Sequence, residues 1–176
     1  MNSKIKERFL AYWLPQKTTE AGFTLTELLI VTIIIGILSA IALPAMLTRA
    51  NKARQTEAKL YVGAMNRAQQ AYYFENTVFT SNIDELGAGI KQETDNYLYQ
   101  IDINANNLVV THNGLSKKPV LKSYTGVTFL NTFTLPSGAT ESVTITILCE
   151  SPAVGVGTSE NMASGNCPTD WILLPN

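Results

Sequence analysis

The chain has 176 residues, of which 45% are hydrophobic and only 15% are charged, and its formal net charge is −1. Soluble domains usually carry about 25% charged residues, and dedicated nucleic-acid binders are strongly basic. Two cysteines and one histidine exclude a zinc site built from several such ligands, and they leave His112 as the only histidine base for a catalytic triad. The composition therefore favours neither an enzyme nor a protein with a metal or another cofactor.

An uncharged apolar run occupies residues 28–47, with Thr32 and Ser39 as its polar side chains. A helix of this length spans about 30 Å, which is the thickness of the hydrocarbon core of a bilayer. We therefore expect a transmembrane helix. Both flanking segments are basic, so charge alone does not set its orientation.

Two other interpretations of the apolar run stay open. A buried core helix of a soluble domain would be apolar on one face rather than on every face. A secretory signal peptide could be cut at Ala40-Ile41-Ala42, but its polar n-region would be unusually long and the apolar run continues past that point.

The junction before the run carries a specific motif. Residues 20–28 read EAGFTLTEL, so a Gly22-Phe23 pair is followed by Glu27 where the uncharged span begins. A basic leader, a Gly-Phe junction, a glutamate and then the span, in this order, resemble the N-terminus of type IV pilins and of the related pseudopilins of secretion systems. The resemblance covers about residues 1–73, and residues 66–73 are similar to cyanobacterial pilins in particular.

This resemblance implies a processing pathway. The leader, residues 1–22, would be a class III signal peptide that a prepilin peptidase removes between Gly22 and Phe23, and the new amino group of Phe23 would be methylated. Glu27 would be the fifth residue of the mature subunit, where the family carries its assembly glutamate. The mature chain would comprise a membrane and assembly half-helix (23–48), an amphipathic half-helix (49–76) and a head (77–176), which together form the pilin fold.

Physical chemistry supports a role for Glu27 independently. A carboxylate deep in a membrane costs on the order of 2.5 kcal/mol or more, so it needs a partner. No lysine or arginine lies between Phe23 and Thr48. Cleavage would create an ammonium at Phe23, one helical turn from Glu27 in the same chain or available from a neighbouring subunit. In the alternative, Glu27 lies at the level of the lipid headgroups and has no role.

Gly36 and Pro44 interrupt the apolar run. Proline removes a helical hydrogen bond, and glycine weakens a helix. Either these residues produce a tolerated kink, as is common in membrane helices, or they mark a place where the helix unwinds inside a filament.

Helical signals continue after the run. From 49 to 76 there is no proline and one glycine. Apolar side chains recur at helical spacing while charges occupy the other faces, which predicts an amphipathic helix whose small-residue seam is covered by the following segments. The seam consists of Leu60, Ala64, Ala68, Ala71, Tyr61, Met65 and Tyr72.

The remainder is rich in β-strand signals. We expect a polar loop at 76–96, a hairpin of strands 97–103 and 108–112, and further strands at 119–124, 126–135 and 142–149. A short apolar piece follows at 171–174. An antiparallel sheet laid on the amphipathic helix follows, which is an α+β fold.

Cys149 and Cys167 enclose a stretch rich in Gly, Ser and Asn. If the head lies outside the cytoplasm, a disulfide is expected, and it would pin an otherwise flexible surface loop. Closing a loop of this size stabilises by about 3 kcal/mol in the chain-entropy model. Type IV pilins carry similar C-terminal disulfide loops. The alternative is two unpaired thiols.

Few other residues indicate a catalytic or binding role. His112 is expected to be a plain surface or edge residue. Lys117, Lys118, Lys122 and Tyr124 form a small basic and aromatic patch that offers weak support for contact with DNA.

The first functional hypothesis is a type IV pilus subunit, inserted in the inner membrane by a single span and later polymerised into an extracellular filament. Its partners would be membrane lipid, the peptidase, the assembly machinery of the inner membrane and other subunits. A pseudopilin of a type II secretion system is the second hypothesis, and a minor pilin or adhesin at the fibre tip is the third.

Overall fold

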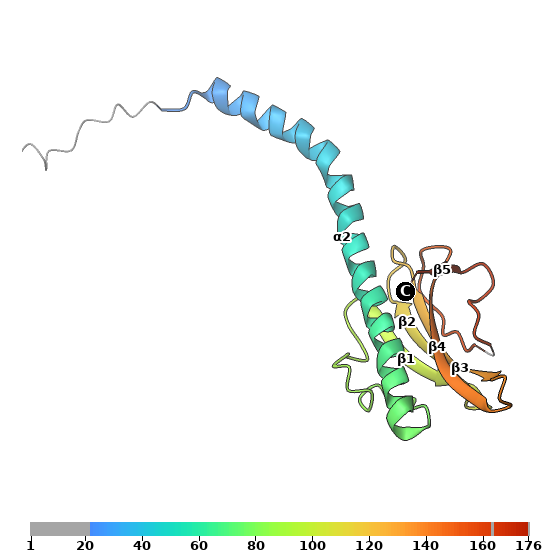
Figure 1. Ribbon diagram of the computed structural model, residues 1–176. Coiled ribbons are helices and arrows are strands. Elements are labelled where there is room, and N and C mark those ends of the chain that lie inside the picture. Colours follow the sequence, from blue (N-terminus) through green and yellow to red (C-terminus); the bar gives the residue numbers. More distant parts are fainter. Residues whose placement is uncertain (1–21, 163, 176) are drawn as a thin grey trace, which may run out of the picture. The chain divides into compact units, whose positions relative to one another are not determined.

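The computed structural model describes residues 22–162 and 164–175, so the predicted leader lies outside the described residues except for Gly22. Figure 1 shows one long helix followed by a sheet. The elements are α2 (Leu25–Asn76), β1 (Tyr97–Ile103), β2 (Val109–Ser116), β3 (Tyr124–Thr134), β4 (Thr140–Glu150) and β5 (Ile172–Leu174). The α+β class is confirmed. The chain divides into two compact units, Met1–Ala45 and Met46–Asn176, which we describe separately.

The five strands form one sheet in the order β1-β2-β3-β4-β5, and every neighbouring pair is antiparallel. The predicted strand at 119–124 is wrong. Residues 117–123 instead form the turn between β2 and β3, where the Leu121 amide donates to the Lys118 carbonyl at 3.2 Å. Pro119 suits the second position of such a turn and cannot donate to a strand ladder.

The second half of α2 packs on one face of the sheet. Its buried apolar residues Ala58, Val62 and Met65 join a core with side chains from the strands, among them Tyr97, Tyr99, Val110 and Leu148. Figure 1 shows this part of α2 running across the strands. The head is therefore held together mainly by helix-on-sheet burial, which stabilises in proportion to the apolar area removed from water.

Two glycines let the helix approach the sheet closely. A Cβ on Gly114 of β2 would lie 2.8 Å from Val62 Cγ2, and a Cβ on Gly126 of β3 would lie 2.2 Å from Asn66 Oδ1. Asn66 reaches over β3 to donate from Nδ2 to the Ile147 carbonyl at 2.9 Å. The glycines are thus packing positions, because any side chain there would push the helix away.

The predicted seam of α2 is only partly correct. Met65 is buried and four other members are partly buried against the core, but Leu60 is 60% exposed and Ala71 is also exposed. The helix instead buries Asn66 and Gln69, which are 2% and 0% exposed. The prediction failed because it assumed that the buried stripe contains apolar residues only. In the structure, the side-chain amides of Asn66 and Gln69 are buried as well.

The prediction that His112 lies at the surface is wrong. His112 is 0% exposed, and all eight residues of β2 are buried. The strand lies between β1 and β3, so both of its edges are paired. Burial lowers the pKa of His112 to about 3, because the charged imidazolium loses its hydration.

The connection between α2 and β1 contains no helix or extended strand, as predicted, apart from an isolated bridge between Glu93 and Leu98. It is not merely polar, however. Ile83, Leu86 and Ile90 are buried in the main core. The segment therefore closes one side of the helix–sheet interface.

Candidate processing and assembly site

The start of α2 is closed by a reciprocal pair of hydrogen bonds. The Glu27 amide donates to Thr24 Oγ1 at 3.2 Å, and the Thr24 amide donates to Glu27 Oε2 at 2.9 Å. The Thr24 hydroxyl also donates to Glu27 Oε2 at 2.8 Å. This is a capping box, which satisfies amide groups that the first turn of a helix otherwise leaves unpaired.

Sequence reasoning singled out Glu27 but missed Thr24. The signal was present, since Thr24-Leu25-Thr26-Glu27 has the spacing of a capping box just before an apolar run. In the uncut chain the nitrogen of Phe23 is an amide and not an ammonium. Thr24 is therefore the partner of Glu27 in this structure.

The predicted cleavage pair lies directly before the cap. Gly22 and Phe23 precede the helix, and the Phe23 side chain is 78% exposed. Exposed, non-helical backbone is the kind of segment that proteases cut. The geometry is thus compatible with cleavage between these residues.

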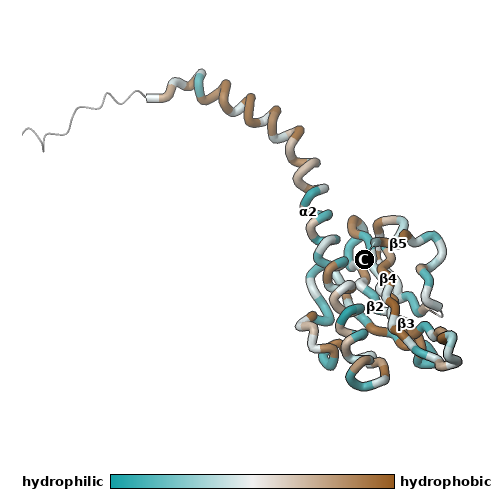
Figure 2. Tube along the Cα trace, in the orientation of Figure 1, coloured by the Kyte–Doolittle hydropathy of each residue, from teal (hydrophilic) through white to brown (hydrophobic). Residues whose placement is uncertain are grey.

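The side chains in the apolar half of α2 are exposed in the part of the chain that the structure describes. Every residue from 22 to 50 is exposed. By length and composition, α2 is the one described helix that could cross a membrane. In Figure 2 the residues of its first part are mostly hydrophobic and those of its second part are mixed. Exposed apolar side chains along such a length must be covered by lipid or by other protein chains.

Gly36 and Pro44 both lie inside α2, which is helical throughout from Leu25 to Asn76. A Cβ on Gly36 would meet nothing within 4 Å. Gly36 thus makes no close packing contact with the residues that the structure describes.

A disulfide joins Cys149 at the end of β4 to Cys167, with a Cα–Cα distance of 5.8 Å. The loop that this disulfide closes also makes hydrogen bonds to β2. The Asn113 amide group donates from Nδ2 to the Glu160 carbonyl at 2.7 Å, and the Met162 amide donates to Thr111 Oγ1 at 3.0 Å. Met162 is only 8% exposed.

These contacts place the loop on the face of the sheet opposite to the helix. Thr111 and Asn113 alternate along β2 with Gly114, which faces the helix, and successive residues of a strand point to opposite faces. Val109, Val127 and Met162 form a second small core there. The disulfide thus closes a segment that covers the outer face of the sheet.

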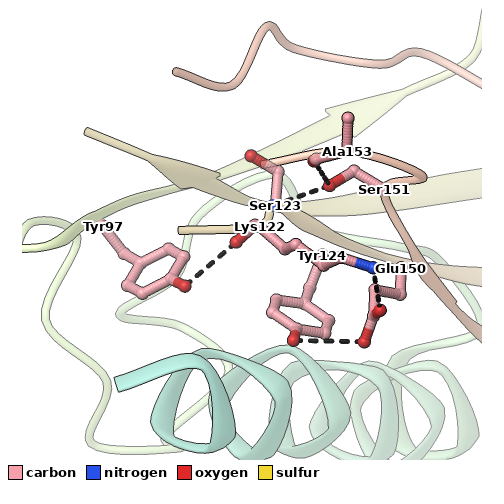
Figure 3. Close-up of polar contacts among 7 residues, drawn as sticks. All are labelled: Tyr97, Lys122, Ser123, Tyr124, Glu150, Ser151 and Ala153. Atoms are coloured by element: carbon pink, nitrogen blue, oxygen red, sulfur yellow. Dashed lines mark hydrogen bonds and ion pairs between the residues drawn. The ribbon is translucent and has the colours of Figure 1, made fainter. Parts of the chain in front are cut away.

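The basic patch proposed for DNA is largely neutralised. Figure 3 shows Lys122 paired with Glu150, whose carboxylate also accepts from the Tyr124 hydroxyl. Lys117 pairs with Glu93, and this hydrogen bond lowers the pKa of the Glu93 carboxyl. Burial, with a contribution from the Glu150 charge, raises the pKa of Tyr124. Two of the three lysines therefore have acidic partners, which weakens the argument for DNA contact.

Within residues 22–162 and 164–175, no three His, Cys, Asp or Glu side chains gather as a metal site would require.

Comparison with known proteins agrees with this arrangement. Residues 55–168 match the family described as type IV pilin-like G and H, and residues 17–43 match the prokaryotic N-terminal methylation motif. The chain therefore belongs to the type IV pilin-like family. No solved structure gives a significant match.

Three relatives illustrate the similarity. The type IV wide pilus major component PilA4 of Thermus thermophilus is 33% identical over 118 residues, which is 61% of this chain and 90% of the relative. The type II secretion system core protein G of Pseudomonas aeruginosa is 35% identical over 81 residues, 46% of this chain and 57% of the relative. The type IV major pilin protein PilA of Myxococcus xanthus is 41% identical over 66 residues, 38% of this chain and 30% of the relative. The chain thus spans less than two thirds of the last two.

Proposed function

We propose that this chain is a non-enzymatic structural subunit of a type IV pilus. The observation that carries the proposal is the apolar half of α2, which is exposed over its whole length and is attached to a folded head of the pilin-like family. Such a helix is stable in lipid before assembly and among other apolar helices after it.

The proposal includes processing of the N-terminus. Prepilin peptidase cuts between Gly22 and Phe23, and Phe23 is then N-methylated; the match to the N-terminal methylation motif supports this step. The new ammonium pairs with Glu27, in the same chain or in a neighbour, and adds to the bonds from Thr24. A charge-assisted pair in a low-dielectric filament core is stronger than a neutral hydrogen bond.

The proposed cellular location of the subunit rests on the apolar half of α2. The precursor is anchored in the inner membrane by a single span within residues 23–48, and after assembly the subunit lies in an extracellular filament. Gly36 and Pro44 are the positions where the packed helix would unwind most easily, because they weaken or remove helical hydrogen bonding.

The test compares wild-type cells with cells that lack the chain. Surface filaments are sheared off, counted by electron microscopy and analysed by mass spectrometry. We expect filaments only in the wild type, with this chain as their main protein. Filaments of unchanged number and composition in the deletion strain would refute the proposal. A chain that is present but scarce would indicate a minor pilin or a tip adhesin.

A pseudopilin of a type II secretion system is the second candidate, and the similarity to core protein G of Pseudomonas aeruginosa favours it. Pseudopilins form a short periplasmic fibre, so the deletion would abolish protein secretion and leave surface filaments intact. The same pair of strains separates the two functions.

A further inference from the structure

Among residues 22–162 and 164–175, one face of the second half of α2 is left largely uncovered. Leu60, Gly63, Arg67, Ala71 and Phe74 follow each other at steps of three or four residues, which is the spacing of one helical stripe. Leu60 is 60% exposed and Phe74 is 90% exposed. Large apolar side chains repeated along an exposed stripe indicate a contact surface.

A groove lies at the beginning of this stripe. It encloses about 450 Å³ between α2, β4 and the C-terminal segment. Leu60 and Gly63 on the helix, Leu148 on β4 and Pro175 contribute an apolar lining, and Lys59 and Arg67 add positive charge. The Arg67 guanidinium lies over Gly63, with Nη1 3.7 Å from the position of an added Cβ. Neither cation has an ion-pair partner among the described residues.

Phe74, Glu75 and Val78 lie at the other end of the stripe, and we call these three residues the projection. Phe74 occupies the last turn of α2 and is followed by the exposed carboxylate of Glu75. Val78, just beyond the helix, is 56% exposed. This projection thus combines an aromatic ring with a negative charge, whereas the groove combines an apolar floor with two positive charges.

We propose that Phe74 of one copy of this chain inserts into the groove of a second copy, with Glu75 paired to Lys59 or Arg67 there. The contact rests on the proposed function, since it specifies how neighbouring heads meet in the filament. An aromatic anchor in an apolar pocket with charges at its rim is the usual composition of a strong contact between proteins.

The positions of projection and groove make the contact repeatable. Gly63 and Glu75 are separated along the helix axis by about 18 Å. When one copy uses its projection and the other its groove, each keeps its second surface available. Contacts of this heterologous kind build open assemblies rather than closed dimers.

The test uses paired cysteines in the full-length chain. Both native cysteines are joined in the disulfide, so a short thiol cross-linker reacts with introduced thiols. Asn76→Cys, two residues from Phe74 in the last turn of α2, is combined with Pro175→Cys at the groove, which leaves Phe74, Glu75 and Leu60 in place. We expect a ladder of cross-linked multimers in membranes and in sheared filaments. The control combines Asn76→Cys with Val156→Cys, whose position is 68% exposed and lies outside the groove; we expect at least about fivefold less product.

Several outcomes would overturn the contact. These are no product from the first pair, equal product from both pairs, or a single dimer band without higher multimers. Labelling of the groove by a photoactivatable anionic phospholipid, in place of the cross-link, would assign the groove to lipid. Cross-linking is also measured in membranes, so the contact is tested even if the chain forms no surface filament. The absence of filaments would refute only the proposed function.

Charge reversal provides a second measurement. Glu75→Lys should lower the cross-linking yield about tenfold, because it places like charges together. Arg67→Glu in the same chain should restore most of the yield. Asp84→Lys makes the same change in net charge at an exposed residue outside the projection and should have little effect. Equal loss in Glu75→Lys and Asp84→Lys would contradict the pairing.

Discussion

At the residue scale, Glu27 is placed at the beginning of the apolar half of α2 and already has a partner in the uncut chain. Thr24 and Glu27 exchange backbone and side-chain hydrogen bonds across the first turn. The carboxylate is therefore held in one orientation before any cleavage. An ammonium formed at Phe23 would add a charged donor beside an oriented acceptor, which costs less than ordering both groups at once.

Glu27→Ala tests this account. The variant should still be cut after Gly22, because the peptide bond is unchanged, but its filament yield should fall about tenfold or more since the ammonium loses its acceptor. Immunoblots of cleaved chain and of sheared filaments measure both effects. Glu27→Asp is the matched control that keeps the charge and should retain partial assembly. Normal yield from the alanine variant would remove the assembly role.

His112 gives a prediction about pH. Its pKa is about 3 in the folded chain and 6.5 for the free side chain. Below pH 6.5 the unfolded chain binds a proton that the folded chain does not, so the free energy of unfolding should fall as pH decreases, by about 1 kcal/mol per pH unit.

The measurement is denaturant unfolding of the full chain in detergent between pH 7 and 5. Glu85 and Glu93, whose pKa values are lowered from 4.5, titrate below this range. His112→Gln should lack the slope while staying polar. An identical slope in both proteins would show that His112 is not the group responsible.

Gly126 gives a prediction about packing. An added Cβ would lie 2.2 Å from Asn66 Oδ1, so Gly126→Ala must displace the Asn66 side chain and its bond to Ile147. We expect a loss of about 2 kcal/mol or more, which is a fall in melting temperature of at least about 4 °C for a chain of this size. Gly155→Ala, where nothing lies within 4 Å, is the control and should change stability by less than about 0.5 kcal/mol. Equal melting temperatures would contradict the close approach.

At the element scale, the two halves of α2 differ in how much of their structure the sequence predicts. The first half is apolar on all faces and was predictable from composition alone. In the second half, propensity and periodicity predicted a helix but not its buried face, because Asn66 and Gln69 enter the core while Leu60 remains outside. Which stripe is buried depends on the sheet opposite, and in particular on the space above Gly114 and Gly126.

The strands were likewise predictable only in part. Alternation and β-branched residues predicted four of the five strands to within a few residues, whereas the segment with Pro119 became a turn. The burial of His112 could not be inferred from its own strand, because His112 is paired with Gly126 and lies on the face of the sheet that the helix covers. The contacts of the loop after Cys149 with Asn113 and Thr111 link residues distant in sequence and left no local signal.

The disulfide makes a prediction at this scale. Replacing Cys149 and Cys167 together by serine should cost about 3 kcal/mol of stability, because the unfolded chain regains the freedom of an open loop. Amide exchange of residues 151–162 should accelerate as well, since this segment rests on β2 by few hydrogen bonds. Reduced wild-type protein should match the variant. Unchanged exchange in the variant would show that packing alone holds the loop.

At the scale of the whole molecule, the described residues comprise an apolar half-helix with exposed side chains and a folded head closed by a disulfide. Cleavage after Gly22 would remove four of thirteen basic residues and two of fourteen acidic ones, so the side-chain charge would change from −1 to −3. The low overall charge fraction thus reflects one long segment that must remain uncharged in lipid and between helices, while the head has an ordinary polar surface.

The central claim is tested most directly by intact-mass and N-terminal analysis of this chain in sheared surface filaments. The account predicts an abundant chain that begins at Phe23 and carries one added methyl group on its amino terminus. A filament chain that begins at any other residue, or the absence of this chain from surface filaments, would contradict the account.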